Sequence, residues 1–340
     1  MVRPEPIARV MRSGLEESVH LGHIAVCDAE GRLLAALGDP HRLVYSRSSM
    51  KPLQAAVSLR RIEEPLPEEL VAVMCASHNG EPEHVRAVRR LLRQGGLAES
   101  ALRCPAAYPS EVGDLVRAGQ PRRVFHNCSG KHAGMVLAAA RAGWGHEGYL
   151  APSHPLQRDV LRAVRKGTGV DRPHVGIDGC GAPVHGVPLS SMATLFARLG
   201  RPHLMGPWAE EIRVATAAMR VHPYLVAGRG RSDTRIMEQV PGIIVKVGAE
   251  ALHCASVLEP GIGVAVKVAD GGERASAPAL VMALASLGFV VHEQLERLAP
   301  IVRRPVLGGG GRVGDIVVDF RLRRPRGRTV RSCCGHGLAR

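Results

Sequence analysis

The chain of 340 residues is poor in lysine and in aromatic residues. Aromatic residues make up only 3%, which excludes a core built on stacked rings and leaves Leu, Val, Ala and Ile to fill it. Arg supplies nearly all of the 45 positive side chains. A retained Lys therefore indicates a site where a proton must be lost or a ligand atom offered, because Arg stays protonated. The five lysines are Lys51, Lys131, Lys166, Lys246 and Lys267.

The sequence also has no apolar run of membrane-spanning length and no apolar signal core after Met1. Eight cysteines are spread along the chain without a C-x-x-C pair. A chain of this size with that cysteine pattern does not form a disulfide framework. We therefore expect a reduced, cytoplasmic protein that does not act at a membrane.

Positive charge is in excess, with a net charge of +14. The arginines are scattered, and the only dense run is Arg321–Arg328 near the C-terminus. No aromatic-rich RNA-binding signature accompanies this run, so nucleic acid is not an expected partner. A non-catalytic nucleic-acid-binding protein is the alternative that rests on charge alone. A basic surface would also attract small acidic or zwitterionic substrates.

Strand-like patterns occur at both ends of the chain and helical periodicity fills the middle. This arrangement predicts an α/β (α+β) fold in which one sheet is assembled from both chain ends. We expect a single catalytic domain over 1–318, with a sheet lobe from about 1–47 and 240–318 and a helical lobe from about 48–239. The stretch Gly308–Gly311 has the composition of a linker, and residues 319–340 form a basic, loosely held tail.

The first chemical motif is the S-x-x-K sequence from Ser48 to Lys51. Residues three apart lie on one face of a helix, which would bring the serine hydroxyl beside the lysine amine. A buried lysine with a lowered pKa can accept the proton of a serine that attacks a carbonyl. Pro52 fits only the first turn of a helix, so the motif is predicted to lie at a helix start.

Two further motifs follow in chain order: an S-x-N sequence from Ser77 to Asn79 and a K-x-G sequence from Lys246 to Gly248. Penicillin-interacting serine enzymes carry S-x-x-K, S-D-N and K-T-G in the same order. The 29 positions between Ser48 and Ser77 are too few for a true β-lactamase. Helix capping by Ser77 and an ordinary strand lysine at Lys246 are the structural alternatives.

Cys128 and Lys131 lie in one Gly-bearing loop and Cys180 in another. Two thiolates and a nitrogen atom could hold Zn²⁺, although the spacing is not that of a zinc finger. A lysine can ligate a metal only in its neutral form. From the residues alone, buried inert cysteines remain the default alternative.

These motifs together resemble the rhizobial-type (class 3) L-asparaginases, the asparaginase II family. The resemblance runs from about Ile7 to Val317. It implies an antiparallel, serine β-lactamase-like and glutaminase-like fold, hydrolysis of L-asparagine to L-aspartate and ammonia, and a homodimer. A glutaminase or a broader amidohydrolase of the same fold is the alternative. The most specific segments are Arg47-Ser48-Ser49-Met50-Lys51-Pro52, Ala76-Ser77-His78-Asn79-Gly80-Glu81, Asn127-Cys128-Ser129-Gly130-Lys131-His132, Asp178-Gly179-Cys180-Gly181-Ala182-Pro183 and Lys246-Val247-Gly248-Ala249-Glu250.

The resemblance implies that four residues are catalytic, with Ser48 paired to Lys51 and Ser77 paired to Lys246. Lys267 is an alternative partner for Ser77. Zinc is implied at a site close to the substrate pocket, held by the three residues Cys128, Lys131 and Cys180. Asp178 and His132 would lie beside that site.

Five residues are candidates for binding the substrate. Asp178 and Glu250 could hold its ammonium group and Arg47 its carboxylate, although each could equally form a structural ion pair. Asn79 belongs to the S-x-N motif, and the backbone near Gly248 could complete an oxyanion hole. Ala251 departs from the family pattern, in which a glycine is expected at this position.

Overall fold

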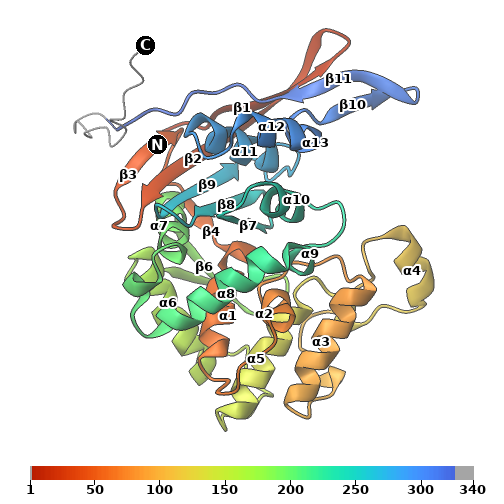
Figure 1. The fold of residues 1–340 in the computed structure, drawn as a ribbon, viewed down its shortest axis with the longest axis vertical. Helices are drawn as coiled ribbons and strands as arrows, with labels where there is room; N and C mark the ends of the chain where they lie inside the picture. Colours follow the sequence, from red (N-terminus) through yellow and green to blue (C-terminus); the bar gives the residue numbers. More distant parts are fainter. Residues whose placement is uncertain (1, 326–340) are drawn as a thin grey trace.

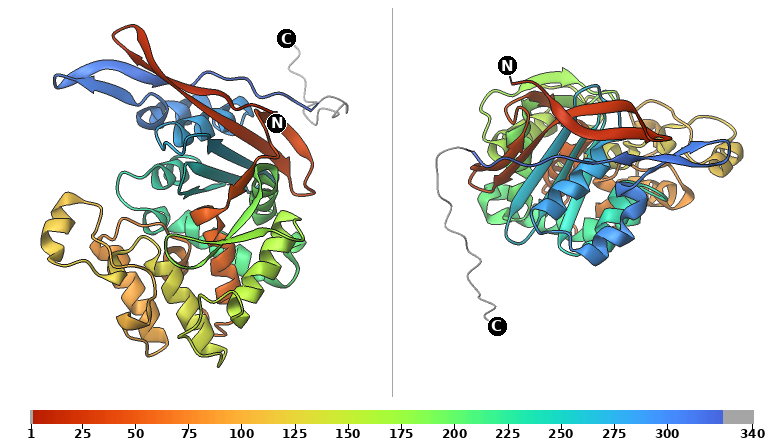
Figure 2. Two further views of the ribbon diagram at one scale, coloured as in Figure 1. Left: turned by 180° about the vertical axis from the view of Figure 1, so that it is seen from behind. Right: turned by 90° about the horizontal axis from the view of Figure 1, so that it is seen from above.

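The computed structural model describes residues 2–325 (Figures 1 and 2). Its main sheet is antiparallel and takes its strands from both ends of the chain, in the order β10-β11-β1-β2-β9-β8-β7, with β3 paired to β2. The predicted α/β class with a sheet from both chain ends is therefore confirmed. The strands are β1 (Glu5–Arg12), β2 (Leu15–Asp28), β3 (Leu33–Leu37), β7 (Ile243–Gly248), β8 (Leu252–Val257), β9 (Ile262–Val268), β10 (Pro305–Gly308) and β11 (Gly311–Val317).

Helices form the block between the two groups of strands. Helix α1 (Lys51–Leu59) is its centre: eight of its nine residues are buried, and α2, α5, α6 and α8 pack around it. Pro52 lies in the first turn of α1, as its position in the sequence predicts. The other helices of the block are α2 (Glu68–Met74), α3 (Pro82–Gln94), α4 (Val112–Ala118), α5 (Ser129–Arg141), α6 (Pro155–Thr168), α7 (Leu189–Leu199), α8 (Ala209–Val221), α9 (Pro223–Val226) and α10 (Ser232–Gln239).

The main sheet is covered on both faces. Helix α7 packs on the face that joins the helical block, against β2, β8 and β9. A Cβ atom on Gly263 would lie 1.8 Å from the carbonyl oxygen of Ala193, so only glycine allows α7 to approach this closely. The opposite face is covered by α11 (Ser276–Ser286), α12 (His292–Arg297) and α13 (Ala299–Val302), as Figure 1 shows.

A second, three-stranded sheet lies next to the helical block and is only partly anticipated by the sequence. It consists of β4 (Leu43–Tyr45), β6 (Pro183–Pro188) and β5 (His174–Ile177), with β6 in the centre. The pattern predicts β5, but β4 has only three residues and β6 begins and ends with proline. This sheet matters for the site because β4 leads directly into the Ser48 motif.

The predicted linker at Gly308–Gly311 is instead the turn of the β10–β11 hairpin. The pattern suggested a linker because consecutive glycines are common to both structures. Beyond the hairpin, the first part of the predicted tail is held against the sheet. Arg323 pairs with Ala36 through the backbone and forms an ion pair of 2.7 Å with Glu5. Residues 326–340 lie outside the described range, and Cys333 and Cys334 are among them.

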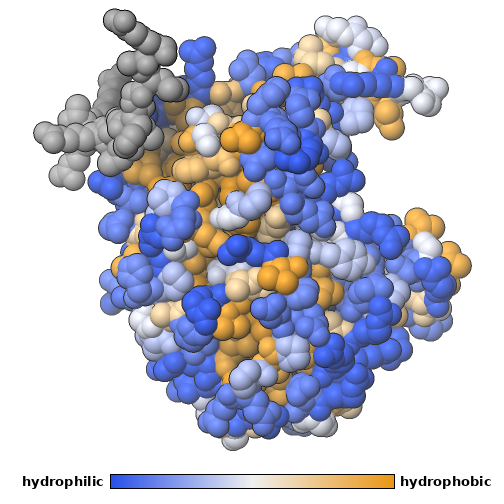
Figure 3. Space-filling model, viewed as in Figure 1, coloured by the Kyte–Doolittle hydropathy of each residue, from blue (hydrophilic) through white to orange (hydrophobic). Residues whose placement is uncertain are grey.

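No helix within residues 2–325 is both long enough and apolar enough to span a bilayer. Hydrophilic residues dominate the face of the molecule in Figure 3, and apolar residues gather toward its middle. The cysteines of the described range are all unpaired and buried, as expected for a chain without a disulfide framework: Cys27, Cys75, Cys104, Cys128, Cys180 and Cys254.

The β1–β2 turn offers a test of how backbone conformation contributes to stability. Gly14 has φ of 85° and Gly148 has a φ outside the left-handed region, while a Cβ atom on either would meet nothing within 4 Å. We expect Gly14→Ala to lower the free energy of unfolding by about 1–2 kcal/mol, the cost of a left-handed conformation for an L-residue. The matched Gly148→Ala should leave stability unchanged or raise it slightly. Urea denaturation measures both, and equal effects would contradict the prediction.

Candidate active site

Lys51 and Ser77 form the central contact of the site. The Lys51 side chain is buried at the start of α1, and its Nζ donates a hydrogen bond of 2.9 Å to Ser77 Oγ. The same amine donates to the backbone oxygens of Ala76 and Asn127. Burial lowers the pKa of Lys51, and the positive charge of Lys131 acts in the same direction. A buried amine that contacts a serine hydroxyl in this way can exchange a proton with it.

Ser48 lies in the short 3-10 helix η1 (Arg47–Met50), immediately before α1. It is half-buried, whereas Ser77 is only 3% exposed. The side-chain hydrogen bonds of Lys51 include Ser77 and none to Ser48 within residues 2–325. The structure therefore adds Ser77 as a partner of Lys51, and the pairing of Ser48 with Lys51 stays a prediction.

The loop that carries Ser77 and Asn79 is fixed by the end of α9 and the residue after it. The backbone N–H groups of Ser77 and Asn79 donate to the carbonyl oxygens of Val226 and Ala227. Both N–H donors of the Asn79 amide are used, by Glu81 and by the Arg229 carbonyl, and Arg231 donates to Asn79 Oδ1 at 3.1 Å. Asn79 therefore offers a substrate only a remaining lone pair of its oxygen atom.

Lys246 is fully buried on β7, and its Nζ donates to the Val247 carbonyl at 2.9 Å. Its other close partner is Asp233 of α10, with Nζ 3.6 Å from Oδ2. Asp233 also accepts a 2.8 Å hydrogen bond from His253 Nε2. Burial lowers the pKa of Lys246 to about 7, while the carboxylate of Asp233 acts to raise it. The predicted Ser77–Lys246 pair does not form a direct hydrogen bond.

Asp233 and His253 are part of this site although no sequence motif indicates them. Burial acts to raise the pKa of Asp233, but His253 and Lys246 outweigh burial and lower it. The carboxylate therefore remains charged and holds the β7 edge, since Asp233 Oδ2 also accepts the Val247 N–H at 2.9 Å. The only signal in the sequence is an acidic residue in the first turn of a short helix just before a K-x-G strand.

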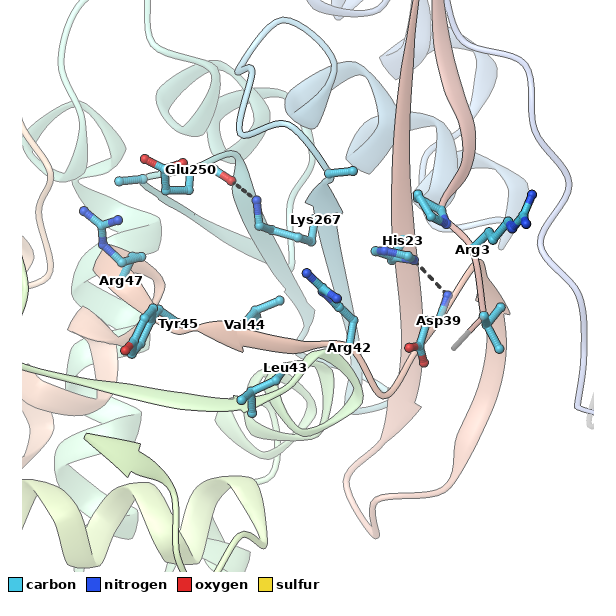
Figure 4. A pocket seen from close by; sticks show the side chains of 14 residues that line it. Arg3, His23, Asp39, Arg42, Leu43, Val44, Tyr45, Arg47, Glu250 and Lys267 are labelled. Carbon is cyan, nitrogen blue, oxygen red and sulfur yellow. Dashed lines mark hydrogen bonds between the residues drawn. The ribbon is translucent and has the colours of Figure 1, made fainter. Parts of the chain in front are cut away.

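Arg47 and Asp178, both predicted to bind substrate, form an ion pair with each other, with Nε 2.8 Å from Oδ1. Arg47 and Glu250 lie along one wall of a cavity of about 440 Å³ (Figure 4). Arg47, Glu250 and Ala251 have φ of 44°, 61° and 53°, so three non-glycine residues here take left-handed conformations. The value at Ala251 is one that glycine adopts without strain, which agrees with the glycine expected at this position.

Gly248 lies against the start of the Ser48 motif. A Cβ atom at this position would be 3.0 Å from Ser49 Oγ and 3.2 Å from Arg47 Cβ. Ser49 Oγ in turn donates a 2.9 Å hydrogen bond to the Lys246 carbonyl. The absence of a side chain at Gly248 thus brings the β7 backbone beside the Ser48 motif.

The remaining two lysines lie away from Ser77. Lys267 lines the same cavity as Arg47, next to Arg42, and donates to the carbonyl oxygens of Glu250 and Val268 (Figure 4). It is therefore not placed to partner Ser77. Lys166 is exposed in the last turn of α6, where a positive charge complements the helix dipole.

Cys128, Lys131 and Cys180 come together in a buried cluster. Lys131 Nζ donates to Cys180 Sγ at 3.0 Å. The Cys180 thiol and the charges of Lys51 and Lys131 lower the pKa of Cys128, whereas the Cys128 sulfur and burial raise the pKa of Cys180. Burial opposes the charge on Lys131, but the two cysteines outweigh it and raise its pKa.

The donor set of this cluster fits zinc in its chemistry once Lys131 has lost the proton that it donates to Cys180. Two sulfur atoms and one amine are buried together, and Asp178 Oδ2 lies 3.9 Å from Cys180 Sγ. Thiolate sulfur and nitrogen are the ligands that zinc prefers. No group of three His, Cys, Asp or Glu residues suited to a metal occurs within residues 2–325, so the third ligand would have to be Lys131. His132, predicted beside the cluster, has its Nδ1 atom 2.6 Å from the Tyr149 hydroxyl.

A sequence model of the L-asparaginase II family matches residues 8–318, which include every motif of the site. The chain belongs to the L-asparaginase II family. It is therefore an enzyme of the asparaginase-type amidohydrolase class and acts on a small molecule. No curated protein sequence matches the chain significantly.

Among solved structures, the chain is similar to a β-lactamase from Mycobacterium bovis, with 18% identity, a TM-score of 0.42 and coverage of 79% of this chain and 95% of that one. It is also similar to a protein from Bacteroides dorei assigned as a β-lactamase. There the identity is 14% and the TM-score 0.46, and coverage is 78% of this chain and 92% of that one.

The cysteine cluster leads to a test of metal binding. We expect Cys180→Ser to reduce zinc affinity at least tenfold, because it removes one of two soft sulfur ligands. The zinc content of purified protein after dialysis against buffered Zn²⁺, measured by mass spectrometry, checks this. Cys27→Ser is the matched control, since Cys27 is buried in β2 and does not contact the cluster. Equal zinc content in both variants would contradict the assignment.

Proposed function

We propose that this protein is an L-asparaginase that hydrolyses L-asparagine to L-aspartate and ammonia through an acyl-enzyme. The observation that carries the proposal is the buried Lys51 amine at 2.9 Å from Ser77 Oγ, next to the Ser48 motif, in a chain of an asparaginase-type family. A buried amine of lowered pKa and two nearby hydroxyls are the groups that amide hydrolysis by a serine nucleophile requires.

In the acylation step, Ser48 Oγ attacks the side-chain amide carbon of asparagine. Ser48 is the more exposed of the two serines, which favours it as the nucleophile. Lys51, in its neutral form, accepts the hydroxyl proton. The C–N bond breaks as that proton passes through Ser77 to the leaving nitrogen, which departs as ammonia. The product is an aspartyl ester on Ser48.

In the deacylation step, water attacks the ester and gives one proton by way of Ser77 to neutral Lys246. As the ester C–O bond breaks, Lys246 returns this proton to the Ser48 oxygen, which restores Ser48, and the second water proton is lost to solvent as L-aspartate leaves. The backbone N–H groups of Ser48 and of the strand end near Gly248 hold the developing oxyanion. The close approach of Gly248 to the Ser48 motif supports this placement. Arg47, Asp178 and Glu250 bind the charged α-carboxylate and α-ammonium groups of the substrate.

Zinc is part of the proposal, with Cys128, Lys131 and Cys180 as its ligands. When bound, zinc would supply a Lewis acid that orients the substrate beside the serines. The homodimer and the cytoplasmic location rest on the family resemblance and on the cysteine pattern. Glutamine remains the alternative substrate, and the ratio of kcat/KM on asparagine to that on glutamine decides between the two.

Ammonia release from asparagine tests the Ser48–Lys51–Ser77 assignment. We expect Ser48→Ala and Lys51→Ala each to reduce kcat at least a thousandfold, since removal of a nucleophile or base typically has an effect of this size. Lys51→Arg keeps the charge but cannot accept a proton, so it should be equally inactive. Lys166→Arg is the matched control and should retain full activity. Near-normal turnover in Ser48→Ala or Lys51→Ala would exclude the mechanism.

The pH dependence of kcat tests the role of Lys246. Its pKa is lowered to about 7, so the neutral, proton-accepting form is present above this pH, and the rate should rise as pH increases through about 7. Asp233→Asn removes the charge that acts to raise this pKa, so the rising limb should move to lower pH.

Asp159→Asn is the control for this experiment, because Asp159 is a buried acid that pairs with Arg61 and Arg162 away from the site. The kcat of the Asp159→Asn variant should rise over the same pH range as the kcat of the unmodified enzyme. If kcat of a folded Asp233→Asn variant rises at the same pH as kcat of the unmodified enzyme, Lys246 is not the titrating group.

A further inference from the structure

A second cavity, of about 410 Å³, lies on the opposite face of β7 from Lys246. Successive side chains of a strand point to opposite faces, so Lys246 faces the candidate active site while Val247 lines this cavity. The starts of α10 and α11 and the segment around α13 form the other walls, which lie together in Figure 1. The catalytic scheme above does not use this cavity.

The lining of this cavity is strongly cationic. Four arginines line it, against a single acidic residue, Glu273. None of the four forms an ion pair with an acidic side chain within residues 2–325, whereas many other arginines of the chain do. The four are Arg231, Arg235, Arg274 and Arg304. Like charges that converge without a counter-ion repel one another, so an anion in the cavity would be favoured.

Two helix starts add to the positive potential of the same cavity. Helix α10 begins at Ser232 and α11 at Ser276, and both serines line the cavity. Neither helix has a side-chain hydrogen bond at its N-cap. Their first N–H groups therefore remain available to an acceptor, and the helix dipoles favour a negative charge there. These helix starts reinforce the site that the arginines define.

The hydrogen-bond donors around the cavity indicate which kind of anion it would bind. Planar guanidinium groups match the oxygens of a phosphoryl group in paired hydrogen bonds, and backbone N–H groups at helix starts bind the same oxygens. The hollow is sized for a small molecule, whereas a nucleic-acid backbone requires an extended basic track. Arg231 also donates to Asn79, so the cavity adjoins the candidate active site through one side chain.

We propose that this cavity is a binding site for a small phosphate-bearing molecule, held by Arg231, Arg235, Arg274 and Arg304. The proposal does not depend on which amide the enzyme hydrolyses. It concerns the phosphoryl group, whether this comes from free phosphate or from a nucleotide.

Isothermal titration calorimetry on the full chain at constant ionic strength tests this proposal. The probes are inorganic phosphate, pyrophosphate and adenosine monophosphate, and the comparison of their affinities identifies the source of the phosphoryl group. We expect saturable binding of at least one probe and at least tenfold weaker binding to the double variant Arg235→Ala/Arg304→Ala. Both arginines are exposed, so the substitutions should preserve the fold, which circular dichroism verifies.

The matched control is Arg93→Ala/Arg220→Ala, which removes the same charge from exposed positions outside the cavity. Its affinity should stay within twofold of the unmodified protein. Three results would each overturn the proposal: no saturable binding of any probe, equal weakening in both double variants, or preferential binding of a DNA duplex that both variants weaken alike.

Discussion

The contact between the Lys51 amine and the Ser77 hydroxyl is the interaction on which the rest of the site depends. It joins the start of the central helix α1 to a loop that the α9 segment fixes from the other side. Burying an amine is unfavourable unless its donors are satisfied, and here one hydroxyl and two carbonyl oxygens accept from it. The hydrogen bonds that allow the Lys51 amine to be buried therefore also place it where it can exchange a proton with the Ser77 hydroxyl.

The structure explains why lysine is retained at three positions of a chain that otherwise uses arginine. Lys51, Lys131 and Lys246 are each 4% exposed or less, and each contacts a different acceptor: a hydroxyl, a thiol and a carboxylate. Burial favours loss of the proton at all three, while the neighbouring anionic groups at Lys131 and Lys246 oppose it. An arginine could not respond to its surroundings in this way, because it remains protonated in every one of them.

Much of the fold could be predicted because its elements follow simple periodicities. Pro52 marks the start of α1, and the strands at both chain ends have regular apolar patterns that predict one sheet. The small sheet and the β10–β11 hairpin were harder, because β4 is very short and because consecutive glycines suit a linker and a turn equally. The pairing of Arg323 with the β3 edge depends on contacts almost 300 residues apart in sequence, which no local pattern records.

The sequence by itself determined the chemical groups of the site: the serines, the lysines and the two cysteines, each marked by a short motif. Only the tertiary structure decided their partners. It places Ser77 against Lys51, pairs Arg47 with Asp178, and brings Asp233 and His253 to Lys246. It also gathers four arginines from the start of α10, the turn before α11 and the segment after α13 around one cavity. The physical reason is that spacing along a chain sets which residues share a face of one element, whereas contacts between elements depend on how those faces pack.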